Sequence, residues 1–428
     1  MRKAFYLLNF LLLGSFLAAL VVDQDRDWKD YQKKYYRMEA ESLRKKLESA
    51  PEPEKAELRA QLASFERRPL EIKQIIVDDL GRVDRCITCH AGMDEFTNPS
   101  MTTGFSEHPF VARRGDAHKT HDFKRFGCTS CHEGQGLALT PEAGHGKVKH
   151  WERPLLAKPY IEASCVRCHG NFEKLAGAQT AALGKRLFEK NGCIGCHSLR
   201  GVGGSISVDL GDIADKPLSR IDFSGAGLKR LDWNIQNWIE LHLTKDPMQL
   251  SPGDPEGHLG EPIPPSGMPP FYETMKPEEA SAITAYLMSM SEESVPHKYF
   301  VYAPPAPAPR FPDARSHGKA VFEKYGCAGC HGLGGAAGRR NFNARGPNQT
   351  KMEEGREPTL VDTVGTFSRE ELVKKIQDGV PSTAVAKFKE GGPTPPLYMP
   401  SWKERIQGKE LEDLVTYLLS IAKKEEAW

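Results

Sequence analysis

The sequence predicts a mainly α-helical chain with an N-terminal transmembrane helix, a central segment with little regular structure and two all-α domains at the C-terminus. Three observations predict this fold class: an apolar N-terminal segment, five cysteine pairs of one spacing and an internal repeat in the second half. At roughly 100 to 200 residues per domain, 428 residues indicate several domains. The 58 basic and 57 acidic side chains nearly cancel, which argues against a nucleic-acid partner.

The apolar segment runs from Ala4 to Val22, directly after Met1-Arg2-Lys3. As a helix it would span about 28 Å, close to the thickness of a bilayer's hydrocarbon core. We interpret residues 1–25 as an uncleaved anchor. The alternative is a cleaved signal peptide, whose apolar part is usually only about 7 to 15 residues long. Arg2 and Lys3 should stay on the cytoplasmic side of the membrane. We therefore expect a single-pass protein of the cytoplasmic (inner) membrane whose bulk is periplasmic or extracytoplasmic.

Residues 26–75 are highly charged, with apolar and aromatic side chains at three- and four-residue spacing from Trp28 onward. This spacing predicts an amphipathic helix that continues the membrane helix and ends near Pro51 and Pro53. A second helix is expected over residues 54–67, folding back on the first. The segment is either a solvated stalk or a hairpin on which a partner docks, because its aromatic face needs a cover.

The ten cysteines form five pairs with the spacing Cys-x-x-Cys, and a histidine follows each pair. Cys-x-x-Cys-His is the attachment signature of c-type haem, in which two thiols bond to the porphyrin and the adjacent imidazole binds the iron. Disulfides, thioredoxin-like redox pairs and zinc sites do not explain five histidines at one offset. The sequence therefore predicts five covalently bound haem c groups, attached at Cys86 and Cys89, Cys128 and Cys131, Cys165 and Cys168, Cys193 and Cys196, and Cys327 and Cys330, with proximal ligands His90, His132, His169, His197 and His331.

Residues 76–175 contain the first three motifs, so porphyrins rather than side chains should supply much of the apolar packing there. The same segment is rich in histidine outside the motifs, which predicts bis-histidine coordination of these three irons. The candidates for the distal ligands are His108, His121, His145 and His150. Their spacing does not assign a histidine to a particular haem.

The second half of the chain contains an internal repeat, because residues 184–193 match residues 318–327. Each copy ends with a methionine followed by proline, Met268 and Met399, and then an apolar helix. Proline keeps such a loop extended, which suits a thioether that must reach an iron atom. We expect both methionines to be distal ligands, although methionine is more often core filler, and Met248 is a weaker candidate for the fourth haem. The two domains should cover residues 176–296 and 313–428, joined by a proline-rich linker, 297–312, that either docks the last domain or lets it move.

Residues 178–296 and 313–425 each resemble a class I (mitochondrial-type) cytochrome c domain, which is all-α with histidine and methionine ligands. Residues 83–90, 126–136 and 145–151 resemble the triheme module of membrane-anchored cytochrome c subunits. Such subunits accompany bacterial menaquinol-oxidising complexes of the cytochrome bc type or the alternative complex III type. The resemblance implies a quinol-oxidising or b-type cytochrome subunit as electron donor, and a soluble cytochrome c or terminal oxidase as acceptor.

Irons with two protein ligands have no open position for a substrate, so we expect an electron-transfer protein that is not catalytic alone. A methionine ligand raises the reduction potential relative to histidine, so electrons should pass from three lower-potential haems to two higher-potential ones. Two alternatives stay open. One is a multihaem enzyme with one open haem, either a peroxidase or an oxyanion reductase. The other is an extracellular wire-type cytochrome.

Overall fold

The structure, a computed structural model, describes residues 2–93, 121–149, 151–292, 295–304, 307–341, 359–381 and 392–423. It divides into two compact units, Met1–Leu155 and Leu156–Trp428. In the described residues, strands form only short antiparallel pairs: β1 (Ile75–Val77) with β2 (Arg82–Asp84), and β3 (Ser198–Leu199) with β4 (Val202–Gly203). The mainly helical fold class predicted from the sequence is therefore confirmed.

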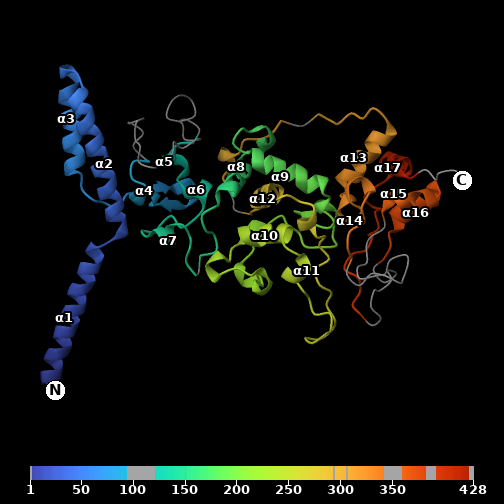
Figure 1. The fold of residues 1–428 in the computed structure, drawn as a ribbon, viewed down its shortest axis with the longest axis horizontal. Coiled ribbons are helices and arrows are strands. Elements are labelled where there is room, and N and C mark those ends of the chain that lie inside the picture. Colours follow the sequence, from blue (N-terminus) through green and yellow to red (C-terminus); the bar gives the residue numbers. More distant parts are fainter. Residues whose placement is uncertain are drawn as a thin grey trace. The chain divides into compact units, whose positions relative to one another are not determined.

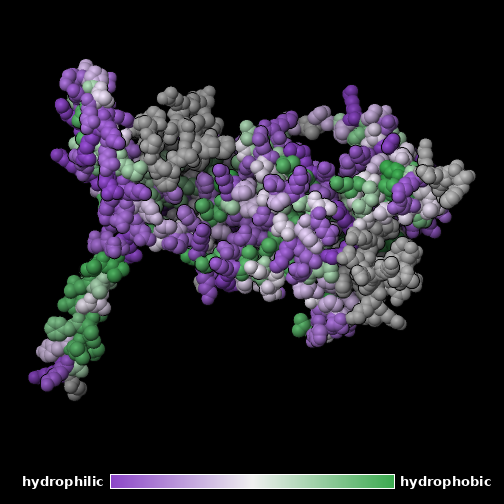
Figure 2. Space-filling view, viewed as in Figure 1, coloured by the Kyte–Doolittle hydropathy of each residue, from purple (hydrophilic) through white to green (hydrophobic). Residues whose placement is uncertain are grey.

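The first unit begins with α1 (Arg2–Gln24), whose residues are all exposed. This helix is long and apolar enough to cross a membrane, with a mean hydropathy of 2.3 over its most apolar part. Figure 2 shows its hydrophobic surface ending where the charged helices begin. The helix does not continue unbroken, because the backbone is extended at Arg26 before α2 begins at Asp27.

Two antiparallel helices follow, α2 (Asp27–Ser49) and α3 (Glu52–Arg67), separated at Pro51 (Figure 1). Tyr35 and Tyr36 of α2 are buried against Phe65 of α3, with ring centroids 6.1 and 6.3 Å from that of Phe65. The fully buried Gln32 side chain donates hydrogen bonds to the carbonyl oxygens of Glu71 and Thr88. The aromatic face of α2 is thus covered from within this unit.

Among its described residues, the rest of the first unit contains β1, β2, a 3-10 turn (Asp78–Leu80) and single-turn helices: α4 (Cys86–Cys89), α5 (Phe123–Phe126), α6 (Thr129–His132) and α7 (Pro141–Gly144). The second unit contains α8 (Ala163–Cys168), α9 (Gln179–Lys190), α10 (Ile235–Thr244), α11 (Pro247–Leu250) and α12 (Pro277–Leu287), then α13 (Ala314–Lys324), α14 (Ala328–His331), α15 (Leu360–Thr363), α16 (Arg369–Asp378) and α17 (Gly408–Ile421).

Both copies of the repeat contain the same crossing of a first and a last helix, α9 with α12 and α13 with α17. The crossings depend on glycine: an added Cβ would lie 1.9 Å from the Ala282 oxygen at Gly184, and 1.9 Å from the Asp413 oxygen at Gly318. Beside each glycine an aromatic pair fills the crossing, Phe188 with Tyr286 and Phe322 with Tyr417. The repeat in the sequence is therefore a repeat of this helix pair.

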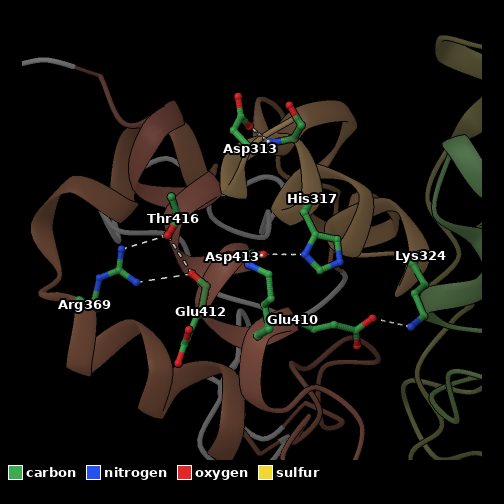
Figure 3. Close-up of polar contacts among 10 residues, drawn as sticks. Asp313, His317, Lys324, Arg369, Glu410, Glu412, Asp413 and Thr416 are labelled. Carbon is green, nitrogen blue, oxygen red and sulfur yellow. Dashed lines mark hydrogen bonds and ion pairs between the residues drawn. The ribbon is translucent and has the colours of Figure 1, made fainter. Parts of the chain in front are cut away.

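The second crossing is also joined by charged side chains (Figure 3). Nδ1 of His317 on α13 donates to the Asp413 carboxylate at 2.6 Å, and Lys324 on α13 pairs with Glu410 on α17 at 2.6 Å. Hydrogen bonds from Lys409 and His317 lower the pKa of Asp413. These contacts attach the two ends of the last domain to each other.

Candidate functional site

The fourth motif contains a 3-10 turn, Cys193–Gly195, followed by His197. Nδ1 of His197 lies 2.9 Å from the Val208 carbonyl oxygen. A carbonyl can only accept, so Nδ1 carries the proton and Nε2 is left for a metal, the usual arrangement of a metal-binding histidine. Burial lowers the pKa of His197, which favours the neutral ring that metal binding requires.

Met268 and Cys193 pack against the same buried core, formed around α9, α10 and α12. The backbone N–H of Met268 donates to Oγ of Ser266 at 3.2 Å, and that of Ser266 donates to the Ser251 oxygen at 2.9 Å. These bonds hold the methionine loop, although it lies far from the motif in the sequence. A motif cysteine and a methionine thus pack on one apolar core.

The fifth motif repeats this arrangement on a second core. Cys327 and Met399 both pack against the buried residues of α13, α16 and α17. The Met399 backbone is held by the Val380 N–H, which donates to the Met399 oxygen at 2.7 Å. Burial raises the pKa of Cys193 and of Cys327 to about 12, and all ten cysteines are free of disulfides. These thiols are therefore available for thioether bonds.

In the first unit the buried carboxylate of Asp84 joins the first two motifs. It lies two residues before Cys86 and accepts hydrogen bonds from the backbone N–H groups of Cys128 and Thr129, at 2.5 and 3.0 Å, and from the Thr129 hydroxyl at 2.7 Å. Side-chain hydrogen bonding between Cys86 and Cys128 lowers the pKa of the Cys86 thiol. Our sequence analysis missed Asp84. The only signal for Asp84 in the sequence was its position two residues before the first attachment motif.

His145 lies beside His90, the proximal histidine of the first motif. Their ring centroids are 6.3 Å apart, with the rings inclined at 45°. Two imidazoles bound to one metal by bonds of about 2 Å would have centroids about 6 Å apart. Burial, and then the neighbouring His145, lower the pKa of His90. Among the predicted distal histidines, the structure places His145 in a position that fits an axial pair with His90.

The third motif lies in the second unit, on α8. The Glu162 carboxylate accepts hydrogen bonds from the Thr180 and Ala181 N–H groups at the start of α9, at 2.5 and 3.0 Å. On its other side, the motif pairs with the linker, because Val301 donates to the Cys168 oxygen and accepts from the Gly170 N–H, both at 2.8 Å. The segment predicted as one triheme module, residues 76–175, is therefore divided between the two compact units.

Two further predicted ligands, His121 and His132, lie in the first unit. His121 packs on Phe126, with ring centroids 5.4 Å apart, and His132 ends α6. His108 and His150 lie outside the described residues. A histidine not proposed as a ligand, His242 of α10, is near the fourth site: its Nδ1 donates to the Trp238 oxygen at 2.8 Å, and burial, then the neighbouring His197, lower its pKa.

The donor sets fit covalently bound haem: cysteine pairs without disulfides, the His197 imidazole oriented by a carbonyl, and in each C-terminal domain a thioether on the same apolar core as a motif cysteine. Comparison with known proteins agrees, because residues 181–291 and 316–422 match the family model for cytochrome c. The chain is also similar to cytochrome c oxidase subunit 2 of Alkalihalophilus pseudofirmus, with 27% identity over 107 residues, 25% of either chain. It thus spans about a quarter of that relative's length. No solved structure matches the chain. Because the two matched segments cover just over half of the chain, the protein belongs to the cytochrome c family.

Proposed function

We propose that this chain is a pentahaem electron-transfer cytochrome c. It carries electrons from a membrane quinol-oxidising or b-type cytochrome subunit through five haems to a periplasmic acceptor. We further propose that α1 anchors it in the cytoplasmic membrane with the bulk of the chain outside. The observation that carries this proposal is the donor set of the two C-terminal domains, in which a motif cysteine and a methionine share one buried core.

Bound haem c supplies reversible one-electron chemistry at its iron. The chain's own residues decide what that chemistry is used for. The cysteine pairs hold the group, and the Val208 carbonyl keeps Nε2 of His197 free to bind. Met268 and Met399 would hold the iron together with His197 and His331, and a thioether ligand would favour its reduced state. An iron held by two side chains would have no position for a substrate, which favours electron transfer over catalysis.

The same reasoning supports an entry point in the first unit. His90 and His145 would form a bis-histidine pair, which has a lower potential than a histidine–methionine pair. Gln32 of α2 binds the Thr88 oxygen inside the first motif, so this motif belongs to the unit that carries the anchor helix. Electrons from a membrane donor would therefore enter at the lower-potential haems and leave from the C-terminal domains.

The proposed acceptor is a terminal oxidase or a soluble cytochrome c. One similar protein is named as a subunit of cytochrome c oxidase, which supports a terminal oxidase as acceptor. A soluble cytochrome c is the other candidate.

The ligands can be tested with methionine variants of the whole protein. In Met268→Ala and in Met399→Ala we expect one of two high-potential components to shift to lower potential. Each variant should also lose part of the weak far-red absorption of ferric iron bound to a thioether. Potentials are measured by redox titration at the haem α-band, and Met248→Ala, on α11, is the control. Unchanged spectra and potentials in both variants would show that these methionines are not ligands.

A further inference from the structure

The fourth and fifth attachment motifs lie back to back in the second unit. A Cβ added to Gly195 would lie 2.3 Å from the Gly326 oxygen, and one added to Gly329 would lie 2.5 Å from the Gly192 oxygen. In the repeat, Gly192 corresponds to Gly326, and Gly195 to Gly329. Each motif therefore offers the same two glycines to the other, as in a two-fold interface between identical subunits. Any side chain at these positions would push the domains apart.

Two neighbouring arginines of the last domain reach across this junction. Arg340 pairs at 3.0 Å with Asp246, the residue before α11, and both side chains are largely buried, with exposures of 15% and 19%. Arg339 places its guanidinium over the Phe271 ring, 5.1 Å from the centroid. Its backbone N–H donates to the Cys330 oxygen at 3.0 Å. The Arg339 backbone is thus hydrogen-bonded to the fifth motif, while its guanidinium lies against the domain that contains the fourth motif.

Phe271, over which the Arg339 guanidinium lies, belongs to the buried core against which Cys193 and Met268 pack. The Arg339 charge therefore lies beside the core that would hold the fourth haem. Burial raises the pKa of Cys193 to about 12, and the Arg339 charge acts in the opposite sense. A fixed positive charge near an iron disfavours its oxidised, more positive state, and the effect is large where water is excluded.

The two methionine loops also touch. A Cβ on Gly267, beside Met268, would lie 2.7 Å from Cβ of Pro396, close to Met399. The fully buried Asn341 fixes this second loop, because its side chain donates to the Leu397 oxygen at 2.9 Å and accepts from the Leu397 N–H at 3.2 Å. Attachment motifs and methionine loops of both domains therefore take part in one junction.

We propose that the two C-terminal domains form one docked dihaem unit, and that Arg339 of the last domain raises the reduction potential of the fourth haem. The last domain is then not a mobile shuttle on a flexible linker. This inference rests on the proposed function, since it takes the two domains to hold haems with methionine ligands. Glycine contacts bring the two attachment points together, which favours direct passage of electrons between the domains.

The effect of Arg339 is tested on the full-length protein. In Arg339→Gln the fourth component should shift to lower potential while the fifth changes less, and Arg339→Lys should restore most of the shift. The fourth component is the one that Met268→Ala moves. The control is Lys374→Gln, an exposed charge on α16 of the same domain, which should leave the fourth component unchanged. A fourth component that stays in place in Arg339→Gln would overturn the tuning role.

Docking is tested separately with the ion pair. Asp246 also caps α11 by accepting from the Met248 N–H, so Asp246→Asn removes the charge and keeps a capping side chain. Arg340→Gln and Asp246→Asn should each increase hydrogen exchange in residues 192–196 and 326–330. The double variant should add little to either single one, because the pair is already broken. Two independent, additive effects, or none, would contradict docking through this pair.

Gly329→Leu is a second route to the same question. It should separate the domains and lower the potential of the fourth haem, as in Arg339→Gln. Haem content is measured first, by pyridine haemochrome. Five haems without any high-potential component would refute the proposed function, whereas five haems with two high-potential components and no response to these variants would refute only the docked unit.

Discussion

At the scale of single residues, the proposed ligand positions divide into those set by the motif and those set by folding. Each proximal histidine follows its cysteine pair in the chain, so its place is local. His145 reaches His90 across more than fifty residues, through the turns around α6 and α7. The centroids of the two rings are 6.3 Å apart. This distance selects His145, among the four candidate histidines, as the proposed distal ligand of the first haem.

That assignment predicts the outcome of removing one imidazole. In His145→Ala we expect one of the five haems to change from low spin to high spin, because its iron loses the distal ligand. Electron paramagnetic resonance of the oxidised protein would detect the change. His258→Ala is the matched control, since the His258 side chain is largely exposed. If all haems stay low spin in His145→Ala, the pairing with His90 is wrong.

At the scale of elements, the crossing of a first and a last helix is the structural unit of both C-terminal domains. The glycine in each first helix lets two backbones meet, and the aromatic pair beside it fills the space that remains. The motif follows directly after the first helix, so the crossing also sets where the attachment cysteines begin. A defect at the crossing should therefore reduce stability and disturb the iron ligands together.

Gly184→Ala tests this directly. Alanine normally stabilises a helix interior relative to glycine, but here its Cβ would meet the Ala282 oxygen at 1.9 Å. We expect a net destabilisation of about 1–3 kcal/mol, the usual cost of overpacking. The measurement is the denaturant midpoint of this domain, followed by the spectrum of its haem. Gly365→Ala, whose Cβ would meet its nearest atom at 3.5 Å, should be close to neutral, and an equal loss in both variants would argue against the crossing.

At the scale of the whole molecule, the chain combines a candidate membrane anchor, two motifs in its first compact unit and three in its second. The third motif is joined through Glu162 to the domain that contains the fourth motif, and through Val301 to the linker. The division into compact units therefore differs from a division into three bis-histidine haems and two methionine-ligated ones.

The proposed place in a membrane chain predicts what accompanies the protein. Purified from native membranes in mild detergent, it should carry five acid-resistant haems per chain by pyridine haemochrome. It should also copurify with a b-type cytochrome or another quinol-handling membrane subunit. Removing residues 2–24, the candidate anchor, should release it from that assembly with all five haems in place. A lone cytochrome that needs no detergent, or one with four haems, would contradict this prediction.

The sequence alone determined the attachment motifs, the candidate anchor helix and the two-domain repeat. These depend on residues that are adjacent or regularly spaced: Cys-x-x-Cys-His within five positions, an unbroken apolar stretch, and helices repeated with their glycine and aromatic positions. The helical hairpin was also predicted from proline positions and from the spacing of Trp28 and the residues after it.

Only the tertiary structure decided which partners meet across long stretches of chain. Four contacts join distant positions: His145 with His90, Asp84 with the second motif, Arg340 with Asp246, and Glu162, beside the third motif, with the start of α9. No local sequence pattern encodes these contacts, because a single charged residue or histidine can equally lie on a solvated surface. They depend on how the helices cross and on which turns the chain makes between the motifs. The linker's proline pattern was compatible with a docked and with a mobile last domain, and the backbone approach at Gly195 and Gly329, with the Arg340–Asp246 pair, favours the docked one.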